Sequence, residues 1–164
     1  MVLFTPSAVF FLVAIWCATG GPFQHTRTAI QYDQQVYKDL RTRHFEGALA
    51  MARLAVKEDA NFEHTHYCLG MALYYTGHYE EAIRELQAAN SLSKGDDTYP
   101  NGYAAAYYFL GYAQSAVGKQ AEARSAWEMV LKYPQGQMAQ QVQTLLEAGD
   151  TPIPAPLTAL PPDA

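Results

Sequence analysis

The stretch HTHYC, residues 64–68, holds the densest set of side chains that could do chemistry. His64 and Cys68 stand four residues apart, a spacing that places them on one face of a helix and suits two zinc ligands. His66 points to another face, and the sequence offers no second Cys/His pair, whereas a structural zinc site needs four ligands. The sequence therefore favours a chain without a metal or another cofactor.

Nucleophilic catalysis by Cys68 would need a base and an oxyanion donor that converge on the thiol. The sequence shows neither, and a small buried thiol is the ordinary role of a lone cysteine in a folded core. A phosphate-binding glycine loop is also missing from the sequence. These observations argue against an enzyme.

Composition limits the remaining classes. The chain has 164 residues, of which 49% are hydrophobic and 16% charged, so it is long and apolar enough for one globular unit. Its formal charge is −5, and its 11 lysines and arginines are spread singly along the chain. Because no basic stripe is available to neutralise a phosphate backbone, we expect no nucleic-acid partner.

The two ends differ in composition from the centre. No charged residue precedes Arg27, and Ala8–Ala18 is an unbroken apolar run of eleven residues. This length suits the apolar core of a secretory signal peptide and falls short of the roughly 20 residues of a membrane span. We expect residues 1–21 to be a signal peptide or an N-terminal membrane anchor. The chain would then be exported, either periplasmic or anchored in the membrane and facing the periplasm or exterior. Five prolines within residues 150–164 predict a flexible tail.

The centre of the chain repeats itself. Leu69-Gly70 recurs as Leu110-Gly111 at an offset of 41 residues. Other positions recur at the same offset: Gly77 as Gly118, Ala82 as Ala123 and Leu86 as Trp127. A second offset, of 34 residues, relates Phe45, Ala48 and Ala55 to Tyr79, Ala82 and Ala89. Three copies of one unit follow from these two offsets.

This unit resembles the tetratricopeptide repeat, a 34-residue helix-turn-helix. The copies are residues 29–62, 63–96 and 104–137, and the first is degenerate, with Val36 at the Leu-Gly position and Arg43 at the turn glycine. The resemblance implies an all-α fold: an α-solenoid of about three helix hairpins within residues 24–149, closed by a capping helix at 138–148. The seven extra residues 97–103 are expected to form a loop. An export segment followed by a few repeats is also similar to the layout of periplasmic tetratricopeptide proteins.

The first helix of the second copy carries apolar residues on two faces. Leu69, Gly70 and Leu73 form one face, and Tyr67, Met71, Tyr74 and Tyr75 form the adjacent one. Packing within the hairpin accounts for the first face. The resemblance implies that the second faces a concave groove, which in this family holds an extended peptide or helix.

Transfer of the groove-facing positions of that family predicts a partner-binding groove with little charge. Its residues are Tyr37, His64, Tyr67, Met71, Tyr74, Tyr75, Tyr108 and Tyr112, and the same pattern also places Asp33, Leu40, Arg41 and Ser115 on this side. The groove lacks the Lys, Asn and Arg set of family variants that grip a carboxylate terminus. We therefore expect a protein-protein interaction scaffold in the cell envelope.

Two alternatives remain open at the level of sequence. Neighbouring repeats or the Pro-rich tail could cover several of the tyrosines. The stack could also be a structural subunit that self-associates or packs permanently in a larger complex, with the tyrosines in an obligate interface.

Overall fold

The computed structural model describes residues 26–93, 100–132 and 136–148, and it is all-α, as predicted. The helices are α2 (Arg27–Arg41), α3 (Phe45–Glu58), α4 (Glu63–Tyr75), α5 (Tyr79–Leu92), α6 (Pro100–Ala116), α7 (Gln120–Leu131) and α8 (Gly136–Ala148). The expected signal or anchor segment and the Pro-rich tail lie outside the described residues. In the described part of the chain, no helix has the combination of length and apolar character that a membrane span requires.

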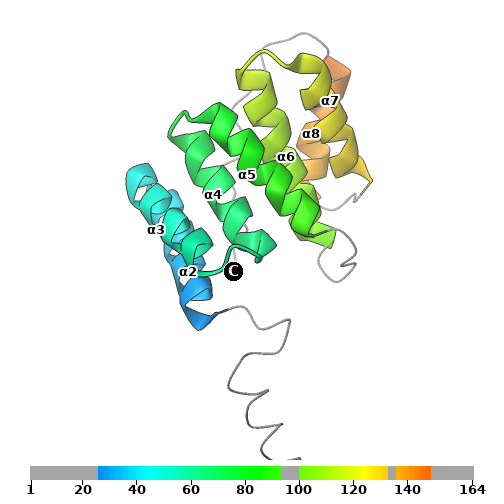
Figure 1. Cartoon of the computed structure of the whole chain (residues 1–164). Coiled ribbons are helices and arrows are strands. Elements are labelled where there is room, and N and C mark those ends of the chain that lie inside the picture. The colour runs from blue at the N-terminus through cyan, green and yellow to red at the C-terminus, as the bar shows by residue number, and fades with distance from the viewer. Residues whose placement is uncertain (1–25, 94–99, 133–135, 149–164) are drawn as a thin grey trace, which may run out of the picture.

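The helices pair into three antiparallel hairpins that stack in sequence order, α2–α3, α4–α5 and α6–α7, and α8 packs on the last of them (Figure 1). Each first helix also contacts the first helix of the next hairpin, α2 with α4 and α4 with α6. The predicted solenoid of helix hairpins with a capping helix is therefore confirmed. The core runs through the stack as one continuous set of buried apolar residues from Val36 to Leu145.

The turn inside each hairpin has the same hydrogen bonds, and one residue at the same position of each turn has a left-handed backbone conformation. Gly77 and Gly118 have φ of +82° and +81°, as their positions predicted. In the first hairpin, Arg43 takes this place with φ of +60°. The residue after each of these donates its amide to a carbonyl five residues earlier: His44 to Asp39, His78 to Leu73 and Lys119 to Gln114. The degenerate copy therefore folds into the same turn without its glycine.

Within the second and third hairpins, a glycine on the first helix receives a large side chain from the second. A Cβ atom built on Gly70 would lie 2.5 Å from Cγ of Leu86, and one built on Gly111 would overlap the indole of Trp127. The Trp127 Nε1–H also donates to the carbonyl oxygen of Tyr108, at 3.2 Å. Gly70 and Gly111 are therefore required because any side chain there would fill the space of the neighbouring helix.

The first hairpin solves the same packing problem with the sizes reversed. Val36 stands where the later copies have glycine, and Ala52 stands where they have Leu86 and Trp127. Val36 and Ala52 are both fully buried. The first hairpin thus keeps a filled core by placing the larger side chain on its first helix.

The prediction of a loop at residues 97–103, between the second and third copies, is wrong in part. Helix α6 begins at Pro100, so Pro100–Tyr103 form its first turns rather than a loop, while residues 97–99 lie outside the described residues. Proline suits the first turn of a helix because that turn leaves its amide donors unused. The extra residues therefore lengthen α6 to 17 residues.

Candidate partner-binding site

Five of the eight predicted groove residues form a half-buried aromatic row on the first two hairpins. Tyr37 comes from α2, and His64, Tyr67, Tyr74 and Tyr75 come from α4. We call these five residues the aromatic row. Because each side chain is partly exposed and partly packed, the row offers apolar ring surface at fixed positions.

Direct contacts link the α2 end of the row to its centre. The Tyr37 hydroxyl and His64 Nε2 lie 3.2 Å apart, within hydrogen-bond distance. The His64 ring is 5.7 Å from the Tyr37 ring and 5.8 Å from the Tyr67 ring, measured between centroids. Tyr67 then meets Phe109 of α6 edge-on at 6.2 Å. Ring contacts therefore connect this part of the row, on α2 and α4, to Phe109 of α6.

The other end of the row packs against two phenylalanines. Phe109 lies 6.0 Å from the ring of Tyr74 and 6.0 Å from that of Tyr75, in edge-on contacts. Phe45, the first residue of α3, stacks on Tyr75 at 5.2 Å. Phe109 is not among the predicted site residues, although the repeat offset of 41 residues pairs it with Cys68, which faces the preceding hairpin. Phe109 is buried, and its ring packs against the rings of Tyr67, Tyr74 and Tyr75.

Three predicted groove residues are buried, contrary to the expectation of an open groove along all three copies. The exposed fractions are 0% for Met71, 1% for Tyr108 and 3% for Tyr112. The hydroxyl of Tyr108 donates to Oε1 of Gln141, and Nε2 of Gln141 donates to the hydroxyl of Tyr112 at 2.9 Å. Gln141 belongs to α8, so the capping helix fills the groove at the third hairpin. Partner binding by any of the eight residues stays a prediction.

The hydroxyl groups of the row keep their protons. Burial raises the pKa of Tyr74 and of Tyr75 to about 12. Burial raises the pKa of Tyr37 and of Tyr67 further still. These hydroxyls therefore stay protonated to a higher pH than the hydroxyl of an exposed tyrosine.

Beneath the row, Asp33 and Cys68 are buried between α2 and α4. Asp33 is 3% exposed and Cys68 is fully buried, which confirms the predicted buried thiol. Burial raises the pKa of Asp33 to about 7, an effect that the weakly donating thiol of Cys68 partly offsets. Burial also raises the pKa of the Cys68 thiol well above its usual range, so this thiol lacks the nucleophilic form at neutral pH.

Comparison with known proteins agrees with the helix hairpins. Residues 64–96 match the family model described as Tetratricopeptide repeat. This match covers a single repeat of the chain. The matched range coincides with the second predicted copy, 63–96, and spans α4 and α5. None of the curated proteins compared with the chain matches it.

The stack of tetratricopeptide-like hairpins is also similar to a solved structure. This is the crystal structure of the Yersinia enterocolitica type III secretion translocator chaperone SycD (alternative dimer), with a TM-score of 0.63. The two sequences are 16% identical, and the similarity covers 75% of this chain and 92% of the SycD chain. At this identity the similarity concerns the fold.

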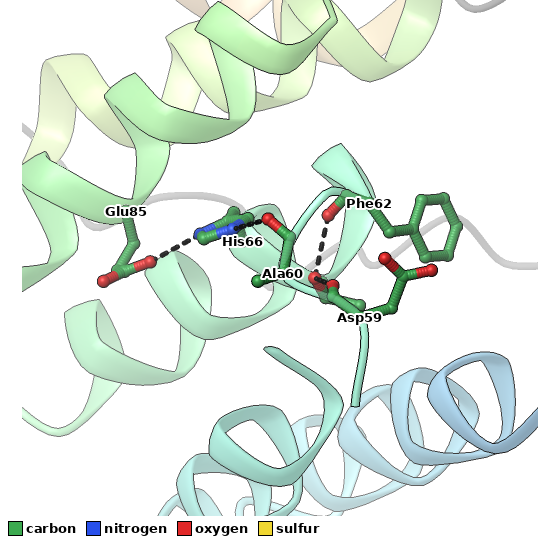
Figure 2. A network of polar contacts seen from close by, with 6 residues as sticks. Asp59, Ala60, Phe62, His66 and Glu85 are labelled. Atoms are coloured by element: carbon green, nitrogen blue, oxygen red, sulfur yellow. Dashed lines mark hydrogen bonds and ion pairs between the residues drawn. The ribbon is translucent and has the colours of Figure 1, made fainter. Parts of the chain in front are cut away.

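In the matched repeat, His66 serves structure rather than the aromatic row. Figure 2 shows its ring between Glu85 of α5 and the turn before α4: Nδ1 lies 2.7 Å from Oε2 of Glu85 and Nε2 lies 3.0 Å from the carbonyl oxygen of Ala60. Beside it, the Thr65 hydroxyl donates to the carbonyl oxygens of Asp59 and Phe62. As predicted, His66 points away from His64, and it ties α4 to α5.

Proposed function

We propose that this chain is a protein-protein interaction scaffold that binds an extended peptide or a helix of a partner protein on the aromatic row. The observation that carries the proposal is a set of five partly exposed aromatic residues on α2 and α4, which ring contacts join to one another and to the buried Phe109. Soluble proteins seldom present aromatic side chains together without a partner for them.

The packing beneath the row favours binding. Phe45 and Phe109 hold the tyrosine rings in place before a ligand arrives, so less side-chain entropy is lost when the ligand binds. A well-packed tyrosine anchor contributes about 2 kcal/mol or more to an interface. Several such anchors side by side would support specific recognition of a partner segment.

The chemistry of the row selects the partner. Neutral hydroxyls and ring faces suit an apolar or weakly polar segment with backbone groups to pair, rather than a carboxylate terminus. The structure similar to this chain is described as that of a type III secretion translocator chaperone. By analogy, the scaffold binds a protein segment and carries out no reaction.

The location remains part of the proposal. The apolar run Ala8–Ala18 supports export, with the repeats in the periplasm or outside the membrane. Fractionation of cells that express the full chain, followed by N-terminal sequencing, tests this location. A full-length chain in the cytosolic fraction would contradict it.

Self-association is the second candidate function, and a specific observation favours it. Ile30 of α2 and Leu54 of α3 are 42% and 40% exposed, large apolar side chains on the hairpin at the start of the stack. Sedimentation analysis of the purified chain separates the two candidates. A stable oligomer in which the tyrosine substitutions below weaken assembly supports the structural role, and a monomer that binds peptides supports the scaffold.

The binding proposal is tested with peptides selected from a random library on the intact chain. Tyr67→Ala should weaken their binding about 10-fold or more, because it removes the central anchor of the row. Tyr107→Ala is the matched control, since Tyr107 is a half-buried tyrosine of α6 in a separate hollow with Leu110 and Gln114. Equal binding by the intact chain and a folded Tyr67→Ala variant would contradict the proposal.

A further inference from the structure

The fold brings together three metal-ligating side chains that are separated in the sequence. They are Asp33 of α2 and His64 and Cys68 of α4. A carboxylate oxygen, an imidazole nitrogen and the thiol sulfur of these residues all lie within 4.8 Å of one another. The sequence alone pairs His64 with Cys68, and the packing of α2 on α4 supplies the third ligand.

The environment of Asp33 is independent evidence for a ligand between these three side chains. Asp33 is 3% exposed. Neither of its carboxylate oxygens accepts a normal hydrogen bond from the described residues. A buried carboxyl group whose nearest donor is a weakly donating thiol is costly, and native proteins rarely keep one without a stronger partner. A cation between Asp33, His64 and Cys68 would remove that cost.

We propose that Asp33, His64 and Cys68 form a binding site for one divalent transition-metal ion, with Zn²⁺ as the cation that fits best. Oxygen, imidazole nitrogen and thiolate sulfur are all zinc ligands, and the mixture of a soft sulfur with nitrogen disfavours Mg²⁺ and Ca²⁺. Three protein ligands leave a fourth position for a water molecule or for the hydroxyl of Tyr37, which lies 3.2 Å from His64 Nε2.

The geometry requires a small contraction of the cluster. Ligand atoms around a tetrahedral zinc ion are about 3.3–3.8 Å apart, because the bonds are about 2.0–2.3 Å long. Ligand atoms at the 4.8 Å limit would have to approach one another by about 1 Å, through rotation of their side chains, when the ion binds. His64 is partly exposed, so the ion reaches the site from the side of the aromatic row.

The site would act on the aromatic row through its ligands. His64 belongs to the row, and α2 and α4 each supply part of the metal site. A bound ion would therefore fix these two helices relative to each other and hold the Tyr37 end of the row in place. The effect on the row rests on the proposed function, whereas metal binding itself can be tested without any peptide.

Co²⁺ is the probe, because a cobalt-thiolate bond gives a charge-transfer band that reports the sulfur ligand directly. The experiment uses the full chain with Cys17→Ser, which leaves Cys68 as its single thiol. We expect the band to saturate at one Co²⁺ per chain and to disappear on addition of Zn²⁺. We also expect Asp33→Asn to weaken Co²⁺ binding about 10-fold or more and Cys68→Ser to abolish the band.

Two control variants carry matched changes outside the site. Asp39→Asn removes another carboxylate of α2, and His78→Gln removes an exposed histidine after α4, and both should leave Co²⁺ affinity unchanged. The absence of a charge-transfer band in the Cys17→Ser chain would overturn the proposal, as would equal affinity in a folded Asp33→Asn variant. Circular dichroism checks folding, and the near-isosteric Asp33→Asn variant decides if Cys68→Ser does not fold.

Discussion

At the scale of single residues, the clearest departure from the repeat pattern is Arg43. Its φ of +60° lies in the left-handed region, where the equivalent residues of the later hairpins are Gly77 and Gly118. A residue with a Cβ atom is strained there by about 1 kcal/mol or more, whereas glycine is not. The first hairpin therefore folds in spite of its turn residue.

Arg43→Gly should stabilise the protein by about 1 kcal/mol, since it relieves this strain and leaves the turn hydrogen bonds intact. Urea unfolding followed by circular dichroism measures the change. Gly77→Ala is the converse control and should destabilise by a similar amount. A destabilising effect of Arg43→Gly would show that the arginine side chain contributes more than its backbone strain costs.

The His66 ring also has a consequence at the residue scale. Both ring nitrogens face acceptors, Glu85 and the Ala60 carbonyl, and a neutral ring has one N–H to serve both. The hydrogen bond to Glu85 raises the pKa of His66 above its ordinary value of 6.5. Since the folded pKa is raised, the stabilisation is complete below about pH 6.5 and is lost as pH rises through the folded pKa.

The Glu85→Gln variant tests this pH dependence. It should lose about 1 kcal/mol of unfolding free energy relative to the intact chain at about pH 5.5, and much less at about pH 8.5. Unfolding curves of both proteins at the two pH values measure the difference. A difference that stays constant with pH would show that His66 does not change its charge in this range.

At the scale of helices, the sequence offsets predicted the hairpins because the repeat places small residues where helices cross. Gly70 receives Leu86, and the turn glycines close the first helices as expected. The start of α6 was not predictable from the offset, because the offset counts extra residues without saying whether they extend a helix or a loop. In the degenerate copy the larger residue, Val36, is on the first helix and the smaller residue, Ala52, is on the second. The repeat pattern therefore did not predict the packing of this hairpin.

A double-mutant cycle tests this reversed packing. Ala52→Leu should destabilise the chain by about 1–3 kcal/mol through overpacking, and Val36→Gly should destabilise it through lost burial. Together they recreate the glycine-leucine pair of the second hairpin, so the double variant should be at least about 1 kcal/mol more stable than the sum of the single changes predicts. Additive changes, measured by urea unfolding, would show that the two positions do not share one space.

At the scale of the whole molecule, the position of α8 determines which of the predicted groove residues on the third hairpin are exposed to solvent. The sequence predicted a capping helix, but it could not show that Gln141 would bond both Tyr108 and Tyr112, because such contacts depend on how α8 sits on α6. The burial of Asp33 beside Cys68 was also not predictable from the sequence, because it results from packing between two hairpins. Among the eight predicted groove residues, those with exposed surface consequently lie on the first two hairpins.

The central claim is that the aromatic row of α2 and α4 receives a partner segment. NMR spectra of the tyrosine rings, recorded as a library-selected peptide is added to the intact chain, test it most directly. We expect shifts in the ring signals of Tyr37, Tyr67, Tyr74 and Tyr75, with the signals of Tyr107 unchanged. Binding that shifts Tyr107 and leaves the four tyrosines of the row unaffected would show that the partner segment docks elsewhere.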